Sequence, residues 1–221
     1  MILQSRRVWV LNDWLEAQVE VSAESGRIEG ICHYGTCVPD MDFGDLRLVP
    51  GFIDVHTHGA YGFDTNDAEE QGLKDWLEKV VGEGVTGILP TTITQSEEVL
   101  TGALRNVAEV ARQQRRDPES VPGAQILGIH FEGPYLDQTY KGAQPEQFCV
   151  TPDVDQFKRY LAASDSLIRI VTLACEHDED YHLTRFLREH GIVPSLGHSS
   201  ATYAQAAMAF ANGARSVTHT T

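Results

Sequence analysis

Val49-Pro50-Gly51-Phe52-Ile53-Asp54-Val55-His56-Thr57-His58 is the stretch around which the rest of the chain can be arranged. Pro50 and Gly51 mark its start, and the apolar run that follows predicts a buried parallel strand, covered on both faces. Side chains alternate along a strand, so the three polar residues Asp54, His56 and His58 share one face. Polar groups that face inward need a partner. The stretch therefore predicts a strand that ends at a metal or another polar ligand.

Composition sets broad limits on the function. The chain has 221 residues, of which 42% are hydrophobic, and this favours a globular protein with a substantial core. Its formal net charge of −15 opposes binding to nucleic acid or to an anionic membrane surface. An anionic substrate would need a local positive site.

Cysteine usage and the N-terminus bear on the compartment. The four cysteines form no C-x-x-C pair, which is typical of reduced thiols in a cytoplasmic protein: Cys32, Cys37, Cys149 and Cys175. The first residues contain no apolar segment of signal-peptide length, and no run approaches the roughly 18 apolar residues of a membrane span. We expect a cytoplasmic protein with no membrane partner.

Two regions differ in pattern. Residues 1–48 contain short alternating segments separated by turns such as Asn12-Asp13 and Ser25-Gly26, which predict a small β-sandwich segment. From residue 49 to residue 221, strands alternate with helices, and this predicts a parallel sheet with crossover helices. Helices are expected over residues 67–81, 96–115, from 151, over 182–190 and over 203–211.

Six strands of the second region are expected, near residues 53, 86, 127, 169, 194 and 217. This favours an α/β fold that contains about six of the eight strands of a TIM-like (β/α) barrel. The alternative is an open, doubly wound sheet of six strands. Because the sequence stops directly after a strand, which would leave a sheet edge unpaired, we expect a barrel domain that is incomplete at the C-terminus.

Imidazole and carboxylate side chains collect at the C-terminal ends of these strands, where barrel enzymes hold their active sites. Such groups are common ligands of hydrolytic zinc or iron. A single strand-end histidine is more often a hydrogen-bonded structural residue, but the number of them here favours ligands. The residues are His56, His58, His130, Glu132, His198 and His219.

Several motifs resemble one family. The first stretch is similar to the opening strand of the amidohydrolase superfamily. His130-Phe131-Glu132-Gly133-Pro134-Tyr135-Leu136, Leu196-Gly197-His198-Ser199-Ser200-Ala201-Thr202-Tyr203 and Val217-Thr218-His219 resemble its N-acetylglucosamine-6-phosphate deacetylases. The H-x-E-G-P segment is the specific one, and the resemblance extends over the whole chain.

The resemblance implies a metal site. Glu132, His198 and His219 would hold the principal divalent ion, zinc or iron. His56 and His58 would be further ligands that permit a second ion. The loop that contains Ala143 and Gln144 falls where the family contacts the sugar, although Gln144 replaces a histidine that is common there. Glutamine can donate a hydrogen bond to a hydroxyl but carries no charge.

The resemblance also implies the reaction, which is removal of the acetyl group from N-acetylglucosamine 6-phosphate, a phosphorylated amino sugar, by a homodimeric enzyme. The family's proton-transferring aspartate lies at the end of an eighth strand, beyond Thr221, so we expect no catalytic residue within this chain and little activity from it alone.

Two alternatives remain. Another amidohydrolase, acting on a cyclic amide or amine, would require a lysine on the fourth strand, and residues 168–176 contain none. A truncated, non-catalytic metal-binding product would release no acetate.

Overall fold

The structure is a computed structural model that describes residues 1–219. The chain divides into two compact units, one comprising Met1–Gly51 and the other beginning at Phe52. The division lies three residues after the boundary expected at residue 48. None of the helices described in residues 1–219 combines the length and apolar character that crossing a lipid bilayer requires.

The first unit is a single five-stranded sheet. Strands β1 and β2 form an antiparallel hairpin, whose turn residues Leu11 and Asn12 both have positive φ, as a two-residue hairpin turn of type I′ requires. β3 extends the sheet beside β2, while β4 and β5 pair with β1 in parallel. The bounds are β1 Ile2–Val10, β2 Asp13–Val21, β3 Ile28–His33, β4 Met41–Asp42 and β5 Arg47–Leu48.

The expected β-sandwich is thus wrong in detail for the described residues, because all five strands belong to one sheet. Its apolar core is small and consists of Val8, Ala17 and Val19. Two buried glutamines lie beside it, with Gln18 Nε2 donating a hydrogen bond to Gln4 Oε1.

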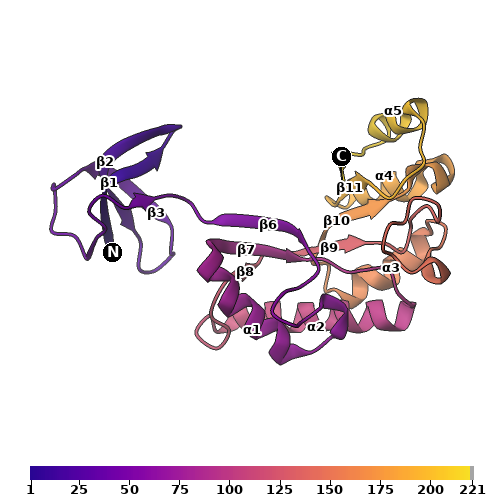
Figure 1. The fold of residues 1–221 in the computed structure, drawn as a ribbon, viewed down its shortest axis with the longest axis horizontal. Helices are drawn as coiled ribbons and strands as arrows, with labels where there is room; N and C mark the ends of the chain where they lie inside the picture. Colours follow the sequence, from indigo (N-terminus) through magenta and orange to yellow (C-terminus); the bar gives the residue numbers. More distant parts are fainter. Residues whose placement is uncertain (220–221) are drawn as a thin grey trace. The chain divides into compact units, whose positions relative to one another are not determined.

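The second unit confirms the expected α/β fold with parallel strands. Three strands form one sheet in the order β6-β7-β8, and four form another in the order β12-β11-β10-β9 (Figure 1). The strands are β6 Phe52–Thr57, β7 Val85–Pro90, β8 Gln125–Ile126, β9 Ile129–Glu132, β10 Ile168–Leu173, β11 Val193–Leu196 and β12 Ser216–Val217.

The two sheets of this unit are joined where β7 ends. Thr91 forms an isolated parallel bridge with His130 of β9, and the amide of Thr92 donates a hydrogen bond of 3.1 Å to the His130 carbonyl. The Thr92 hydroxyl also accepts a hydrogen bond of 3.2 Å from the Glu132 amide. The residues that end β7 therefore connect the three-stranded sheet to the four-stranded one.

Within residues 1–219, five α-helices connect the strands, and several begin at a side-chain cap. Ser96 accepts a hydrogen bond from the Val99 amide at the start of α2, and Thr202 forms a capping box with Gln205 at the start of α5. Short 3₁₀ turns stand before or after several helices. The bounds are α1 Glu70–Val80, α2 Glu97–Arg116, α3 Val154–Ala163, α4 His182–Glu189 and α5 Tyr203–Ala211, with η1 Thr65–Asp67, η2 Val81–Glu83, η3 Glu146–Phe148, η4 Cys175–His177 and η5 Glu179–Tyr181.

The core lies between the strands and the helices α1 to α4. Phe131 of β9 is fully buried and packs against Tyr160 and Phe157 of α3, with ring centroids 4.8 and 6.1 Å apart. Trp76 of α1 and Leu104 of α2 belong to the same cluster. Burial of each such side chain contributes roughly 1.5–3 kcal/mol, so this cluster fixes β9, and with it Glu132, in place.

Two strand predictions need correction. β6 is not covered on both faces, because Phe52, Ile53 and Val55 are 67%, 61% and 46% exposed, and within residues 1–219 the strand pairs only with β7. The expected third strand is divided into β8 and β9 at Gly128. A Cβ at Gly128 would lie 2.3 Å from Arg169 Cγ, so glycine is needed where the chain leaves one sheet for the other.

Candidate metal centre

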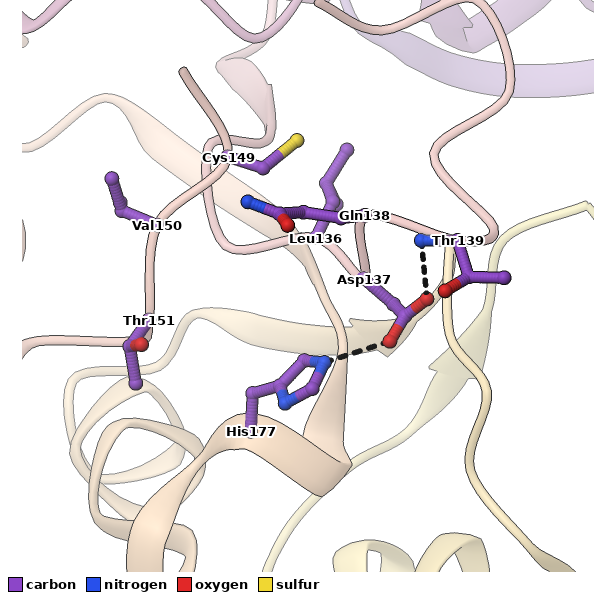
Figure 2. Close-up of a pocket in the computed structure, with 8 residues that line it drawn as sticks. All are labelled: Leu136, Asp137, Gln138, Thr139, Cys149, Val150, Thr151 and His177. Atoms are coloured by element: carbon purple, nitrogen blue, oxygen red, sulfur yellow. Dashed lines mark hydrogen bonds and ion pairs between the residues drawn. The ribbon is translucent and has the colours of Figure 1, made fainter. Parts of the chain in front are cut away.

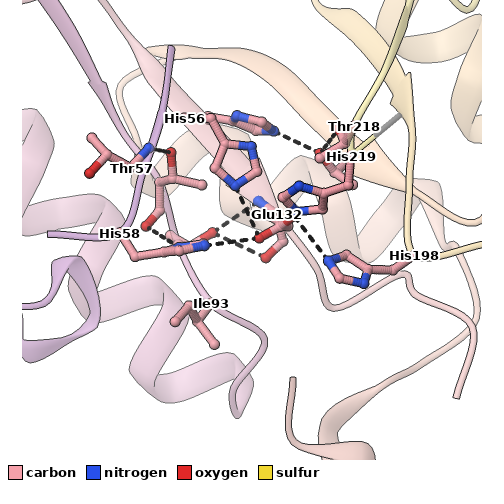
Figure 3. A network of polar contacts seen from close by, with 12 residues as sticks. His56, Thr57, His58, Ile93, Glu132, His198, Thr218 and His219 are labelled. Atoms are coloured by element: carbon pink, nitrogen blue, oxygen red, sulfur yellow. Dashed lines mark hydrogen bonds and ion pairs between the residues drawn. The ribbon is translucent and has the colours of Figure 1, made fainter. Parts of the chain in front are cut away.

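Four histidines and one glutamate converge at the carboxyl ends of the parallel strands (Figure 3). His56 lies near the end of β6 and His58 follows it; Glu132 is the last residue of β9. His198 and His219 come two residues after β11 and β12. The four-stranded sheet therefore contributes two imidazoles, one after β11 and one after β12. The end of β6 contributes the other two.

The Glu132 carboxylate is the centre of this group. On one side, His198 Nε2 and His219 Nε2 lie 3.3 and 3.4 Å from its Oε1 atom. On the other side, His58 Nε2 and His56 Nε2 lie 3.2 and 3.6 Å from Oε2. All four imidazoles thus turn the same ring nitrogen toward one carboxylate, and the structure brings together all five predicted ligands.

The charge state of Glu132 follows from these neighbours. Its side chain is 1% exposed, and burial by itself would raise the pKa. The imidazoles of His198, His56 and His58 outweigh burial and hold the pKa of Glu132 well below its ordinary range. Glu132 is therefore a buried anion.

The contacts of Nδ1, the ring nitrogen that faces away from Glu132, fix the tautomer of two of the imidazoles. His58 Nδ1 lies 3.2 Å from the Thr91 carbonyl, and His198 Nδ1 lies 3.0 Å from the Tyr140 carbonyl. A carbonyl only accepts, so both Nδ1 atoms carry the proton and, in the neutral ring, Nε2 offers a lone pair. This is the usual arrangement of a metal-binding histidine.

These features allow a test of whether a cation fits. Glu132 Oε1 is buried and has no hydrogen-bond partner among the described residues, although two imidazoles face it. The separations of 3.2–3.6 Å exceed the roughly 2.7–2.9 Å of charge-assisted hydrogen bonds. An unpartnered carboxylate oxygen surrounded by imidazole lone pairs has the chemistry of a divalent-metal site.

His130, which the sequence also places at a strand end, is different. Its Nδ1 lies 2.9 Å from the Val55 carbonyl and its Nε2 lies 2.7 Å from Thr172 Oγ1, so both ring nitrogens are already occupied. Burial lowers the pKa of His130 to about 4, and the ring is neutral. It connects β6, β9 and β10 beneath the cluster.

The two predicted substrate contacts occupy different environments. Ala143 is exposed, whereas Gln144 is 5% exposed. The Gln144 amide donates a hydrogen bond of 3.0 Å to Glu132 Oε2 and accepts one of 2.7 Å from the Thr94 amide. Gln144 therefore contacts the carboxylate directly.

A second polar group was missed by the sequence reasoning. Asp137, Glu176 and His177 bring their ligand atoms within 4.8 Å of one another. They lie beside the loop that contains His198, and Asp137 and His177 also line a cavity of about 360 Å³ (Figure 2). The position of Glu176 and His177 in η4, three and four residues after the end of β10, was the available signal, because polar residues at that end of a strand gather near the others.

The carboxylates of this second group already have partners. His177 Nε2 lies 2.8 Å from Asp137 Oδ2, and the Ser200 hydroxyl donates to the same oxygen at 3.0 Å. Glu176 accepts from the Ser199 hydroxyl at 2.6 Å and from the Ser200 amide at 2.5 Å. This group is a hydrogen-bonded support for the loop after β11.

Residues 47–219 match the amidohydrolase family. The chain belongs to the amidohydrolase family. Hydrolases of this family are metal-dependent, which agrees with the donor set around Glu132. The resemblance that the sequence motifs indicated is thereby confirmed.

Similar proteins are named for one type of reaction. N-acetylglucosamine-6-phosphate deacetylase of Bacillus subtilis is 40% identical over 175 residues, which are 79% of this chain and 43% of the relative. N-acetylgalactosamine-6-phosphate deacetylase of Escherichia coli O157:H7 is 33% identical over 218 residues, covering 99% of this chain and 55% of the relative.

Solved structures agree with these relatives. N-acetyl-D-glucosamine-6-phosphate deacetylase of Mycobacterium smegmatis, solved with N-acetyl-D-glucosamine-6-phosphate, superposes with a TM-score of 0.86 at 30% identity, covering 100% of this chain and 55% of that one. The chain thus spans about half the length of the relatives that it matches.

Proposed function

We propose that this chain is the metal-binding part of a hydrolase that removes the acetyl group from N-acetylglucosamine 6-phosphate, giving glucosamine 6-phosphate and acetate. The convergence of four imidazole Nε2 atoms on Glu132, whose Oε1 has no hydrogen-bond partner, carries the proposal. The names of the relatives support the choice of substrate.

The proposed ligands are Glu132, His198 and His219, with His56 and His58 as further ligands on the Oε2 side. A zinc or iron ion held by these residues would supply Lewis-acid chemistry, which can polarise an amide carbonyl and lower the pKa of a water molecule. Residues of this chain supply the charge and the ring orientation of the proposed site. Glu132 contributes the negative charge, and the Thr91 and Tyr140 carbonyls keep the His58 and His198 rings in the tautomer that turns Nε2 inward.

The same proposal extends to the architecture and the setting. Strands β6 to β12, with their helices, would be part of a TIM-like (β/α) barrel, in which strand ends meet around one site. A cytoplasmic location fits the four cysteines, all of which are free. The homodimer and the sugar contacts of Ala143 and Gln144 stay predictions.

The first test is the metal content of the purified chain by elemental analysis, after dialysis against metal-free buffer. We expect one or two equivalents of zinc or iron in the wild type, and a loss in Glu132→Gln and His198→Ala. His190→Gln is the matched control, because His190 is an exposed residue at the end of α4 and lies outside the cluster. Well-folded wild-type chain that retains no metal would contradict the proposed site.

The second test is acetate release by the product of the native gene. N-acetylglucosamine 6-phosphate is the expected substrate, and N-acetylgalactosamine 6-phosphate is the second sugar to assay because the Escherichia coli relative is named for it. A metal-loaded native protein that releases acetate from neither sugar would contradict the deacetylase assignment and leave the metal site standing.

A further inference from the structure

Gln144 lies on the loop between β9 and η3, yet its side chain is buried against two other segments. Its Oε1 accepts a hydrogen bond of 2.7 Å from the Thr94 amide, which follows β7. Its Nε2 donates a hydrogen bond of 3.0 Å to Glu132 Oε2. The side chain therefore joins the carboxylate to a backbone group of the segment that follows β7.

The orientation of this amide is dictated by its partners. A backbone N–H can only donate, so the atom facing Thr94 must be the oxygen of Gln144. The nitrogen is then necessarily the atom that faces Glu132, and the ionised carboxylate can only accept. Both hydrogen bonds hold the glutamine in one rotamer, because reversing the amide would leave two buried groups unpaired.

This contact makes the two oxygens of Glu132 unequal. Oε2 is occupied by the Gln144 donor, while Oε1 has no hydrogen-bond partner and faces the His198 and His219 rings. A carboxylate can rotate about its last bond, which would exchange the two oxygens. The hydrogen bond from a fixed donor opposes that rotation, so one oxygen is kept for an ion.

We propose that Gln144 is a positioning residue for the metal-binding carboxylate: it reserves Oε2 of Glu132 and thereby presents Oε1 to an ion held with His198 and His219. This inference rests on the proposed metal site.

The test uses Gln144→Met, which keeps the length of the side chain and removes its donor and acceptor. Co²⁺ is the probe, since both its affinity, from competition with a chelator, and its visible absorption spectrum can be measured. We expect one or two Co²⁺ ions per wild-type chain, as for the native metal. Loss of a residue that orients a ligand typically weakens metal binding about 10–100-fold, so Gln144→Met should bind Co²⁺ that much more weakly and with a changed spectrum.

Asn66→Leu is the matched control. Asn66 also holds the segment after β7 with two hydrogen bonds. Its Nδ2 donates to the Ile93 carbonyl at 2.7 Å, and its Oδ1 accepts from the Ile93 amide at 3.2 Å. Neither bond involves Glu132. If Gln144 merely stabilised that segment, Asn66→Leu would weaken Co²⁺ binding equally. We expect it to lower the melting temperature of the metal-free protein while leaving the Co²⁺ affinity and spectrum unchanged.

Two results would overturn the proposal. They are wild-type affinity and spectrum in Gln144→Met, and an equal loss of affinity in Asn66→Leu. If Gln144→Met fails to fold, Gln144→Asn replaces it, and unchanged Co²⁺ binding in that shorter side chain is equally contrary. Wild-type chain that binds no Co²⁺ would contradict the proposed metal site itself, which separates the two failures.

Discussion

The backbone amide of Asp137 donates a hydrogen bond of 2.9 Å to the carbonyl oxygen of His198. The Asp137 carboxylate also accepts hydrogen bonds from the amides of Thr139 and Tyr140, at 2.8 and 3.0 Å. The Tyr140 carbonyl in turn contacts His198 Nδ1. One aspartate thus shapes the loop that holds both the backbone and the ring of His198.

Asp137→Ala should therefore destabilise the protein and weaken its metal site together. The variant leaves the Thr139 and Tyr140 amides without their acceptor, and because both residues are exposed we expect a loss of about 0.5–1.5 kcal/mol. Urea unfolding of metal-free protein and zinc content after dialysis are the measurements. Asp155→Ala, which removes an exposed carboxylate paired with Lys158, is the control and should change neither. Full zinc content in Asp137→Ala would show that the loop does not orient His198.

His130 and His219 should respond to mutation in opposite ways. His130→Ala removes a buried ring with two partners, so we expect a loss of about 2–4 kcal/mol in the unfolding free energy of metal-free protein. His219 has a 53% exposed side chain, and His219→Ala should change that free energy by less than about 0.5 kcal/mol. Metal affinity should instead fall in His219→Ala. Unfolding free energies from chemical denaturation and metal affinities from titration distinguish the two variants. Equal destabilisation by His130→Ala and His219→Ala would refute the structural role given to His130.

Glu97 and Arg159 connect α2 to α3, and their contribution should depend on pH. The hydrogen bond from Arg159 is the main cause that lowers the pKa of Glu97 below its ordinary value. A depressed pKa in the folded state means that the stabilisation is present above the unfolded pKa of roughly 4.3 and is lost as pH falls through the folded pKa. Glu97→Gln should therefore melt below the wild type at pH 7, and the difference should shrink at pH 3.

The pair is largely exposed, so the difference at pH 7 should be small. Glu98→Gln, one residue further along the same helix, serves as the control for the loss of one negative charge near the helix start. A melting difference for Glu97→Gln that is constant between pH 7 and pH 3 would contradict the role given to the ion pair.

Local signals allowed much of the fold to be predicted. α5 was expected over residues 203–211 and spans Tyr203–Ala211, because the Asn212-Gly213 pair marks its C-terminal end in the sequence. The structure adds the Thr202 capping box at its start. The five proposed ligands were likewise recognisable, since each carries an imidazole or carboxylate and lies at or just after the end of a parallel strand.

Other features depend on neighbours that no local pattern specifies. The exposure of β6 reflects which strands lie beside it, and the break at Gly128 reflects the close approach of Arg169. The role of Gln144 depends on a backbone amide 50 positions away in the chain, at Thr94. Because the partners of such a side chain are set by tertiary packing, the sequence showed only that Gln144 departs from a family pattern.

The candidate centre lies where the two parallel sheets meet, at the bridge between Thr91 and His130. His56 and His58 belong to one sheet, and the other three proposed ligands belong to the other, so an ion that engaged both sets would cross-link them. Ion binding would then resist local opening of this joint, by about 4 kcal/mol at a free metal concentration 1,000 times Kd. Chelation should speed hydrogen exchange at the Thr91 and Thr92 amides more than within α2. Metal supply would then govern how often the two halves of this unit separate, and hence how readily proteases reach the chain between them.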